Sequence, residues 1–262
     1  DSALPVLQRL EEAADGRLGV YAATLEGRVL AAYRAGERFP MCSTFKAVLA
    51  AAILEKAAHT PGLLERRIRY GREDLVPWAP ITEKHLDEGM TVAALCDATV
   101  RYSDNPAANL LLRLIDGPAG LTRWMRAQGD DDFRLDRWET ELNAAIPGDP
   151  RDTTTPRAMG NSLARLALGD ALRPAARAQL QDWLKRNTTG DTRIRAGVPA
   201  GWVVGDKTGT GAYGATNDIA IVWPAERAPF ALAVYFTTTR EFAKPRNDVI
   251  AEATRLVIGA LG

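Results

Sequence analysis

Residues 202–237 read WVVGDKTGTGAYGATNDIAIVWPAERAPFALAVYFT and contain three apolar runs separated by turn residues. The runs cover 202–207, 218–223 and 230–237. They are rich in Val, Ile, Phe and Tyr, which favour strands. Two similar runs, 18–25 and 29–33, flank a Glu26-Gly27 turn. We therefore predict one antiparallel sheet of five strands, built from both ends of the chain.

Between these strands, and at the two termini, apolar residues recur at helical spacing. The predicted helices are 4–14, 44–58, 91–102, 107–115, 121–128, 157–168, 174–187 and 247–261. The pattern indicates a single domain, 1–262, of the α/β class. It has a discontinuous α/β lobe (about 1–35 and 191–262) and a helical lobe (about 36–190). Clefts between such lobes commonly bind ligands, so we expect the site there.

Composition excludes several classes of function. Lys plus Arg and Asp plus Glu both number 33, and this balance argues against nucleic-acid binding. No apolar run approaches the ~20 residues of a membrane span. The histidines His59 and His85 lack further ligands at metal-binding spacing, so we predict no zinc site, no cofactor and no Ser-His-Asp triad. The chain starts at Asp1 without a signal peptide, which is typical of a processed product.

The segment Ser43-Thr44-Phe45-Lys46 precedes an Ala-rich predicted helix. Residues three apart share a helix face, so the Ser43 hydroxyl and the Lys46 amine can approach each other. Backbone N–H groups at a helix start suit a developing oxyanion, and a buried lysine has a lowered pKa. The alternative interpretation is a capping serine followed by a solvated lysine.

Two further motifs follow along the chain. Residues 103–105 read SDN after a predicted helix, where they also suit a simple helix cap. Residues 207–211 read KTGTG at the end of the strand 202–206. Glycine there lets a ligand approach the strand backbone, while Lys207 and the threonine hydroxyls suit a carboxylate. The alternative is a Gly-containing turn with an exposed lysine.

The three motifs occur in the order S-x-x-K, S-D-N and K-T-G, which is the signature set of class A β-lactamases and penicillin-binding proteins. The chain therefore resembles the penicillin-recognising serine acyltransferases from end to end. The resemblance implies the two-lobed β-lactamase/transpeptidase-like fold, in which helices flank a five-stranded antiparallel sheet beside an all-helical lobe.

A fourth segment separates the members of this superfamily. Residues 137–143 read RWETELN, which is similar to the E-x-x-L-N motif in the omega loop of class A β-lactamases. By this resemblance Glu139 and Asn143 hold a hydrolytic water, and Arg137 and Asp152 form the ion pair that closes the loop, about 137–152. Read alone, Arg137 and Asp152 are two solvated charges of little energetic weight.

The resemblance implies a complete mechanism. Ser43 attacks the lactam carbonyl while the backbone N–H groups of Ser43 and Thr210 stabilise the oxyanion. Either Lys46 or Glu139 acting through a water is the base for this step. Ser103 passes a proton to the lactam nitrogen, and a water activated by Glu139 then hydrolyses the ester. The expected function is hydrolysis of penicillins and cephalosporins, which confers antibiotic resistance.

Substrate-binding residues are implied in the same way. Asn105 is expected to bind the acylamino side chain. Lys207, Thr208, Gly209, Thr210 and Arg193 are expected to surround the substrate carboxylate, with Arg193 replacing an arginine that many relatives carry on the next strand. Trp78 matches an aromatic gate at the cleft mouth, although a core or surface tryptophan is the other interpretation.

Two departures from the family pattern carry further expectations. Some members form a disulfide between the cysteine before the nucleophile and a cysteine just after K-T-G. This chain has Cys42 at the first position but Gly211 at the second. The usual partner of Cys96 is replaced by Ala50, so we predict that both thiols are free. The residue after the catalytic glutamate is often proline in a cis bond. We therefore predict a cis peptide at Glu139–Thr140.

Two alternatives to a hydrolase remain at this stage. One is a penicillin-binding transpeptidase or β-lactam sensor, which is acylated but does not release the product. The other is a binding or scaffold protein that kept the fold and lost activity. The resemblance further implies small-molecule β-lactam substrates and inhibitors as partners, a monomer, and a periplasmic or secreted location.

Overall fold

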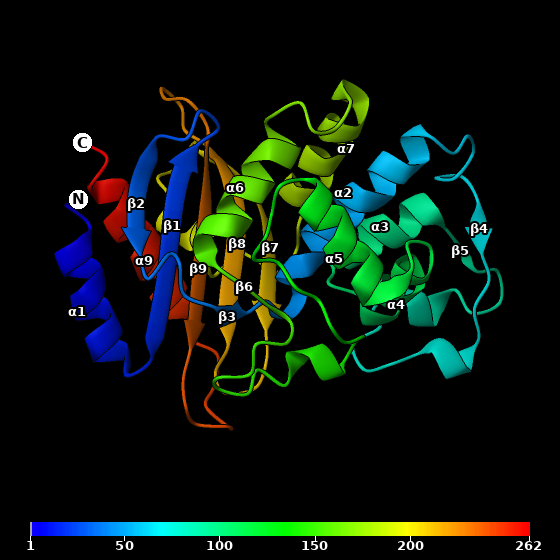
Figure 1. Cartoon of the computed structure of the whole chain (residues 1–262), viewed down its shortest axis with the longest axis horizontal. Coiled ribbons are helices and arrows are strands. Elements are labelled where there is room, and N and C mark those ends of the chain that lie inside the picture. The colour runs from blue at the N-terminus through cyan, green and yellow to red at the C-terminus, as the bar shows by residue number, and fades with distance from the viewer. Residues whose placement is uncertain (1) are drawn as a thin grey trace.

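The computed structural model describes residues 2–262 and contains the predicted five-stranded antiparallel sheet. Its strand order is β2-β1-β9-β8-β7, so the two ends of the chain meet where β1 pairs with β9 (Figure 1). The strands are β1 (Arg17–Thr24), β2 (Val29–Tyr33), β7 (Val203–Thr210), β8 (Thr216–Trp223) and β9 (Phe230–Thr237).

Strand β7 is longer than the sequence pattern predicts. The predicted strand ended near residue 206, but the pairing with β8 continues to Thr210, which lies opposite Thr216. The K-T-G motif therefore lies inside an edge strand. Glycine at 209 weakens the sequence signal for a strand, whereas the ladder to β8 holds the backbone extended.

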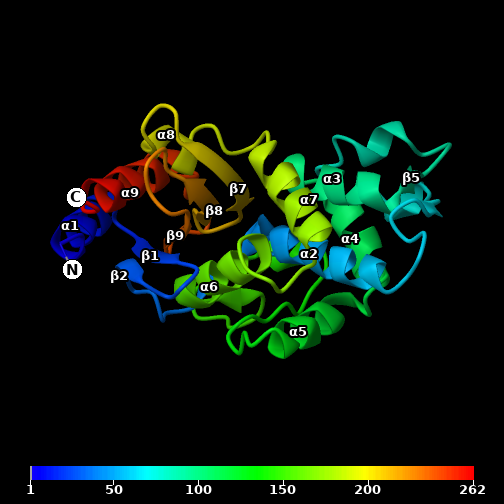
Figure 2. The same ribbon diagram turned by 90° about the horizontal axis from the view of Figure 1, so that it is seen from above.

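Helices cover both faces of the sheet (Figure 2). On one face, Val20, Leu232 and Val234 pack with α1 (Leu4–Ala14) and α9 (Asn247–Gly259). On the other face, Ile219, Ala233 and Tyr235 belong to the cluster that includes α2 and α6. The helices bury both faces of the sheet. Because successive strand residues point to opposite faces, consecutive residues are then buried and the strands read as continuous apolar runs.

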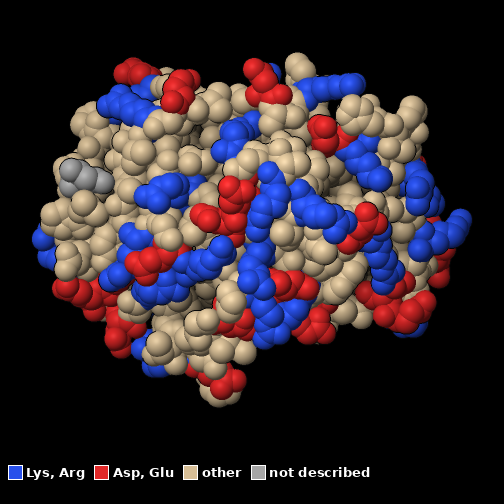
Figure 3. Space-filling model, viewed as in Figure 1, with Lys and Arg blue, Asp and Glu red and all other residues tan. Residues whose placement is uncertain are grey.

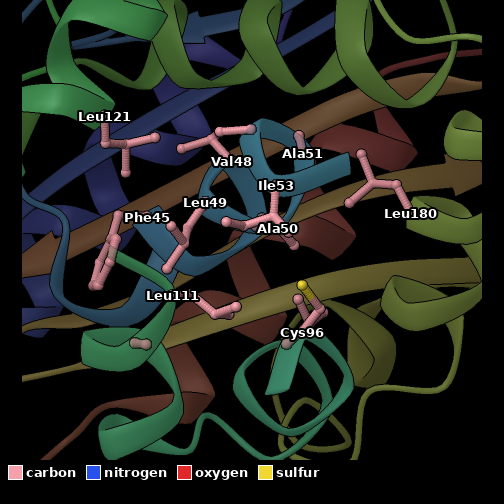
Figure 4. Packing of buried hydrophobic residues seen from close by; sticks show 14 of the residues in the cluster. Phe45, Val48, Leu49, Ala50, Ala51, Ile53, Cys96, Leu111, Leu121 and Leu180 are labelled. Atoms are coloured by element: carbon pink, nitrogen blue, oxygen red, sulfur yellow. The ribbon is translucent and has the colours of Figure 1, made fainter. Parts of the chain in front are cut away.

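The helical segment between β2 and β7 is built around α2 (Phe45–Ala58), whose side chains from Phe45 to Leu54 are all buried (Figure 4). A helix that is apolar on every side belongs in a core. Its neighbours are α3 (Val92–Arg101), α4 (Asn105–Arg113), α5 (Gly117–Ala127), α6 (Pro156–Ala167) and α7 (Pro174–Lys185), and the short α8 (Ile194–Gly197) lies beside α9.

Most helix bounds agree with the prediction to within a few residues. Helix α4 starts at Asn105 instead of 107, because the Asp104 carboxylate accepts a hydrogen bond from the Ala107 amide and caps the helix there. The predicted helix 44–58 is preceded by the 3-10 turn η1 (Cys42–Thr44). The remaining 3-10 turns are η2 (Arg72–Asp74), η3 (Thr82–Lys84) and η4 (Glu141–Asn143).

Four two-residue strands were not predicted: β3 (Phe39–Pro40) pairs with β6 (Thr153–Thr154), and β4 (Arg67–Ile68) pairs with β5 (Met90–Thr91). Two residues are too few to show a period. Helix α6 packs against β1, β8 and β9, so sheet and helical segment share a core. The division into two lobes stays a prediction.

Side chains of both charges are interspersed over the face shown in Figure 3, in keeping with the balanced composition. Of the helices within residues 2–262, none has the length and apolar character that a membrane crossing requires.

Candidate active site

A cavity of about 360 Å³ lies between the β7 edge of the sheet and the helical segment. Its lining residues are Ser43, Trp78, Ser103, Asn105, Asn143, Thr189, Arg193, Thr208, Gly209 and Thr210. All of these except Thr189 were singled out from the sequence. Three further predicted residues, Lys46, Glu139 and Lys207, are buried and contact the lining residues, so segments far apart in the chain meet at one place.

Ser43 lies in the turn η1, directly before α2. The turn is held by the Met41 carbonyl, which accepts hydrogen bonds from the Thr44 amide at 3.1 Å and the Thr44 hydroxyl at 2.8 Å. The sheet touches this turn at Gly209, where a Cβ atom would lie 2.7 Å from the Met41 oxygen and 3.0 Å from the Ser43 nitrogen. Only glycine therefore allows β7 to approach Ser43 so closely.

Lys46 is completely buried beside Ser43 in α2. Its Nζ donates to the Ser103 carbonyl at 2.8 Å and to Asn105 Oδ1 at 2.5 Å, and lies 3.4 Å from Glu139 Oε1. Burial lowers the pKa of Lys46, and the Glu139 carboxylate opposes that shift. Within residues 2–262, no hydrogen bond joins the amine to Ser43 Oγ. Because Lys46 is completely buried, the alternative of a solvated lysine is wrong.

Ser103 connects two buried lysines. Its backbone has a left-handed φ of 58°, and its Oγ accepts from Lys46 Nζ at 3.2 Å and from Lys207 Nζ at 3.0 Å. Burial holds the pKa of Lys207 well below its usual value, and the charge of Lys46 adds to this effect. A hydroxyl has two lone pairs and one proton. With both lone pairs engaged by lysines, the Ser103 proton is available to a group in the cavity.

Asp104 and Asn105 form hydrogen bonds that hold the neighbouring loop, residues 77–82, in place. Besides capping α4, the buried Asp104 carboxylate accepts the amides of Ile81 and Thr82 at 3.0 and 2.9 Å. The Asn105 side chain accepts from Lys46 and donates through Nδ2 to the Pro77 carbonyl at 2.8 Å. The motif at 103–105 is therefore both a helix cap and part of the cavity wall.

Trp78 belongs to that loop and is 60% exposed, with a left-handed φ of 67°. Its indole Nε1 donates to the Tyr102 carbonyl at 2.9 Å, and its own carbonyl accepts the Asn105 amide at 3.0 Å. The ring is held at the cavity while one side remains open to solvent. This exposure excludes a core tryptophan, while the gate and the surface interpretation both stay predictions.

Glu139 is buried, and its two carboxylate oxygens have different surroundings. Oε2 accepts from Asn143 Nδ2 at 2.8 Å, whereas Oε1 contacts only Lys46 Nζ, at 3.4 Å, and accepts no hydrogen bond from residues 2–262. Asn143 Oδ1 is likewise buried without a donor. Buried acceptors of this kind are normally paired with protein or water. The peptide bond between Glu139 and Thr140 is cis, as predicted.

Asn109 holds Glu139 in place and was missed by the sequence analysis. Its side chain accepts the Glu139 amide at 2.9 Å and donates to the Glu139 carbonyl at 3.0 Å. Both contacts go to backbone atoms, so no motif in the residues around Asn109 reports them. The available signal was a polar residue within residues 106–112 of α4, which are otherwise apolar.

The predicted pair between Arg137 and Asp152 is present, and it is not a pair of solvated charges. Arg137 Nε lies 2.6 Å from Asp152 Oδ2, and Asp152 Oδ1 accepts the amides of Asp136 and Arg137 at 2.7 and 2.9 Å. The Asp152 side chain is 1% exposed. This buried carboxylate joins the two ends of the segment that carries Glu139 and Asn143.

Arg193 lies behind the end of β7 and is 7% exposed. Its Nη1 donates to the carbonyls of Gly209 and Asn217, each at 2.8 Å, and its Nη2 donates to Thr210 Oγ1 at 2.6 Å. The guanidinium thus brings a positive charge to the threonine side of the cavity. Thr189, the unpredicted lining residue, lies 2.7 Å from Thr208 through their hydroxyl oxygens.

Both cysteines are free and buried, as predicted. A Cβ atom at Gly211 would lie 2.6 Å from Cys42 Sγ, so position 211 faces Cys42 but offers no sulfur. Figure 4 shows Cys96 directed toward α2 near Ala50. Burial raises the pKa of the Cys42 thiol to about 12, and the Glu139 charge adds to this effect.

Comparison with known proteins gives consistent matches over nearly the whole chain. The sequence pattern of the "Beta-lactamase enzyme family" matches residues 5–261. The chain is 57% identical over 255 residues to the "Carbapenem-hydrolyzing beta-lactamase KPC" of Klebsiella oxytoca, covering 97% of this chain and 87% of that one. It is 49% identical over 263 residues to the "Beta-lactamase SME-1" of Serratia marcescens, covering 100% and 90%.

Solved structures agree with these matches. A β-lactamase from Desulfarculus baarsii superposes with a TM-score of 0.97 at 61% identity, covering 99% of this chain and 97% of the other. The class A β-lactamase GNCA4, described as the last common ancestor of Gram-negative bacteria, superposes with a TM-score of 0.96 at 57% identity, covering 100% of both chains.

Proposed function

This chain belongs to the β-lactamase enzyme family, in class A, and we propose that it hydrolyses penicillins and cephalosporins through an ester on Ser43 that a Glu139-activated water releases. The observation that carries this proposal is the pair formed by Glu139 and Asn143. Each offers a buried oxygen that receives no hydrogen bond from residues 2–262, in the segment that reaches the Ser43 cavity. A water held by these two acceptors has a general base beside it.

In the acylation step, Ser43 Oγ forms a bond to the lactam carbonyl carbon and its proton passes to a base. The backbone N–H groups of Ser43 and Thr210 stabilise the negative oxygen. When the C–N bond breaks, the lactam nitrogen takes the Ser103 proton, and Lys46, which donates to Ser103 Oγ, passes the proton taken from Ser43 on to Ser103. Two groups fit as the base: Lys46, whose pKa is lowered by burial, and Glu139 acting through the same water.

In the deacylation step, Glu139 takes a proton from the water while the hydroxide attacks the ester carbon. The bond to Ser43 Oγ then breaks, and Ser43 Oγ takes the proton that Glu139 had removed from the water. Asn143 orients Glu139 through the 2.8 Å hydrogen bond to Oε2. General-base catalysis of this kind is typically worth about 10²–10⁴-fold in rate.

The substrate carboxylate fits the end of β7. Thr208 and Thr210 line the cavity there, and Lys207 and Arg193 lie directly behind them. Asn105, on the opposite wall, suits the acylamino side chain, and Trp78 covers the mouth. Because the relative KPC is named for carbapenem hydrolysis, a carbapenem belongs in the substrate panel together with a penicillin, a cephalosporin and a monobactam.

A chromogenic cephalosporin separates this proposal from a transpeptidase or β-lactam sensor. A hydrolase gives sustained turnover with many product molecules per protein, whereas a sensor gives one burst equal to the protein concentration. Intact-mass spectra of the wild type and of Ser43→Ala assign the nucleophile. An adduct of one drug molecule on Ser43→Ala, or a single stoichiometric burst from the wild type, contradicts the proposal.

We infer that the protein acts as a monomer in the periplasm or outside the cell. The proposed site residues lie together within one folded copy of the chain, which supports a site formed by a monomer. Light scattering on the purified protein tests the monomer, and fractionation of cells that express the gene tests the location. A dimer at micromolar concentration, or activity confined to the cytoplasm, contradicts this part.

A further inference from the structure

The two proposed oxyanion donors come from different parts of the fold. Ser43 lies in the turn η1, directly before α2, and Thr210 lies on the edge strand β7. Donors of this kind stabilise a transition state only when both lie at about 2.7–3.1 Å from the developing charge. The contacts between η1 and the sheet therefore determine whether the two N–H groups act together.

One of these contacts comes from Asn217, a residue that no sequence motif assigns. Asn217 lies on β8 as the cross-strand partner of Gly209 and is 1% exposed. Its Nδ2 donates to the carbonyls of Pro40 and Met41 at 2.8 and 3.1 Å. Carbonyl oxygens only accept, so the side of the amide that faces them is the NH₂ group.

The Met41 carbonyl is the acceptor that also holds the Ser43 turn. It receives the amide and the hydroxyl of Thr44 in addition to Asn217 Nδ2. A single buried oxygen thus ties the turn that contains Ser43 to the middle of the sheet. Next to this tie, position 209 on β7 leaves no room for a side chain, because a Cβ atom there would lie 3.0 Å from the Ser43 nitrogen.

Asn217 is itself fixed from the other side of the strand pair. The Arg193 guanidinium bridges the carbonyls of Gly209 and Asn217, each at 2.8 Å. Arg193 therefore holds β7 and β8 in register at the pair Gly209 and Asn217, from which the Asn217 side chain reaches η1. The connection runs from the strand that carries Thr210, through Arg193 and Asn217, to the turn that carries Ser43.

We propose that Asn217 is a positioning residue for the oxyanion site: its side-chain amide holds the turn η1 so that the Ser43 N–H and the Thr210 N–H converge on the same oxygen. This inference rests on the proposed function. Asn217 touches neither the cavity nor the reacting atoms. Its effect acts through the Met41 carbonyl, which loses a donor when the amide is removed. The Pro40 and Met41 segment then shifts relative to Gly209, and the two donors no longer converge.

The first test replaces Asn217 by leucine, which has a similar size and no donor. The ester is trapped in the Glu139→Ala background, and its carbonyl stretching frequency is measured by infrared difference spectroscopy. We expect Asn217→Leu to move this band to higher wavenumber, because weaker hydrogen bonds polarise the carbonyl less. With Glu139 intact, the acylation rate per active site should fall by about 10–100-fold, somewhat less than the 10²–10³-fold effect of losing a whole oxyanion donor.

The matched control is Thr254→Val in α9. It also removes one buried hydrogen bond, from the Thr254 hydroxyl to the Ile250 carbonyl at 2.9 Å, and Thr254 is not one of the residues that line the cavity. A variant that is merely less stable lowers the melting temperature and the active fraction but leaves the carbonyl band and the rate per active site unchanged. We expect that pattern for Thr254→Val.

A second variant keeps the inference testable if Asn217→Leu does not fold. In Asn217→Asp, an ionised carboxylate faces two carbonyl oxygens and is repelled, whereas the protonated acid donates one hydrogen bond. Burial raises the pKa of such a carboxyl group. The acylation rate of Asn217→Asp, divided by that of the wild type at the same pH, should therefore rise between about pH 8 and pH 5.

The outcomes separate the inference from the proposed function. If Glu139→Ala forms no ester on Ser43, the proposed function fails. If the ester forms but Asn217→Leu leaves its carbonyl band and the acylation rate unchanged, the inference about Asn217 fails alone. A rate ratio for Asn217→Asp that stays constant over the pH range also overturns it.

Discussion

Glu139 and Lys46 are opposite charges, both buried and 3.4 Å apart, next to the serine that forms the ester. We expect Glu139→Ala to acylate with good substrates and to accumulate the ester, because the deacylation step loses its base, at a cost of about 10²–10⁴-fold. Mass spectrometry after rapid quenching measures the ester. Glu141→Ala, an exposed carboxylate in the same segment, is the control and should turn over normally. Free Glu139→Ala enzyme recovered at wild-type speed contradicts the assignment.

Asp218 is a buried carboxyl group behind the strand that carries Lys207. Burial, and next the charge of Asp206, raise the pKa of Asp218 well above its usual value. The folded state therefore retains this proton at pH values where the unfolded chain, with a pKa near 3.9, has lost it. A folded state that binds more protons becomes less stable as pH rises, from about pH 4 up to the folded pKa.

Asparagine at this position is neutral at every pH, so Asp218→Asn should remove that dependence. We expect its free energy of unfolding to exceed the wild-type value by an amount that grows as pH rises above about 4. Urea unfolding at pH 5, 6 and 7 measures it. Asp248→Asn is a control of opposite sign, because hydrogen bonding to Arg246 lowers the pKa of Asp248. A stability difference for Asp218→Asn that is flat with pH refutes the expectation.

At the scale of elements, the segment 137–152 is held at its ends by the Arg137–Asp152 pair. Asp152→Ala leaves the guanidinium and two backbone N–H groups without their acceptor, so we expect a loss of about 3–5 kcal/mol. Deacylation should fall more than acylation, because Glu139 and Asn143 belong to this segment whereas Ser43 and Lys46 do not. Calorimetry and single-turnover kinetics measure the two effects.

The control for this variant is Asp149→Ala in the same segment. Asp149 pairs with Arg151, whose side chain is 47% exposed, and pairs of this kind contribute about 0–1 kcal/mol. We expect little change in stability or in deacylation. Equal losses from Asp149→Ala and Asp152→Ala would show that burial of the carboxylate is not the cause.

At the scale of the whole molecule, the free cysteines make stability independent of redox conditions. A reductant should leave the wild-type melting temperature unchanged. In Gly211→Cys, by contrast, a sulfur is introduced beside Cys42, across the junction of β7 and η1. A bridge there closes a loop of more than a hundred residues, so the melting temperature should rise by an amount that reductant reverses. No reductant effect on Gly211→Cys, or a clear one on the wild type, contradicts the geometry.

The sequence by itself determined the sheet, most of the helices and the main members of the site. Helices are visible in the sequence because a buried face repeats at helical spacing, whereas the strands are visible as continuous apolar runs because the sheet is buried on both sides. The motifs at Ser43, Ser103, Lys207 and Glu139 identify chemistry because each combines reactive side chains at a short spacing. The free thiols and the cis peptide followed from departures of this chain from a family pattern.

The tertiary structure alone decided how these pieces are held. Asn109, Thr189 and Asn217 are single polar residues whose partners lie in other segments, so neither period nor spacing marks them. The extension of β7 through Lys207 to Thr210 depends on its ladder to β8. A hydrogen bond forms only when folding brings donor and acceptor within about 3 Å. The sequence therefore predicts which groups react, whereas the packing of distant segments determines where these groups lie relative to one another.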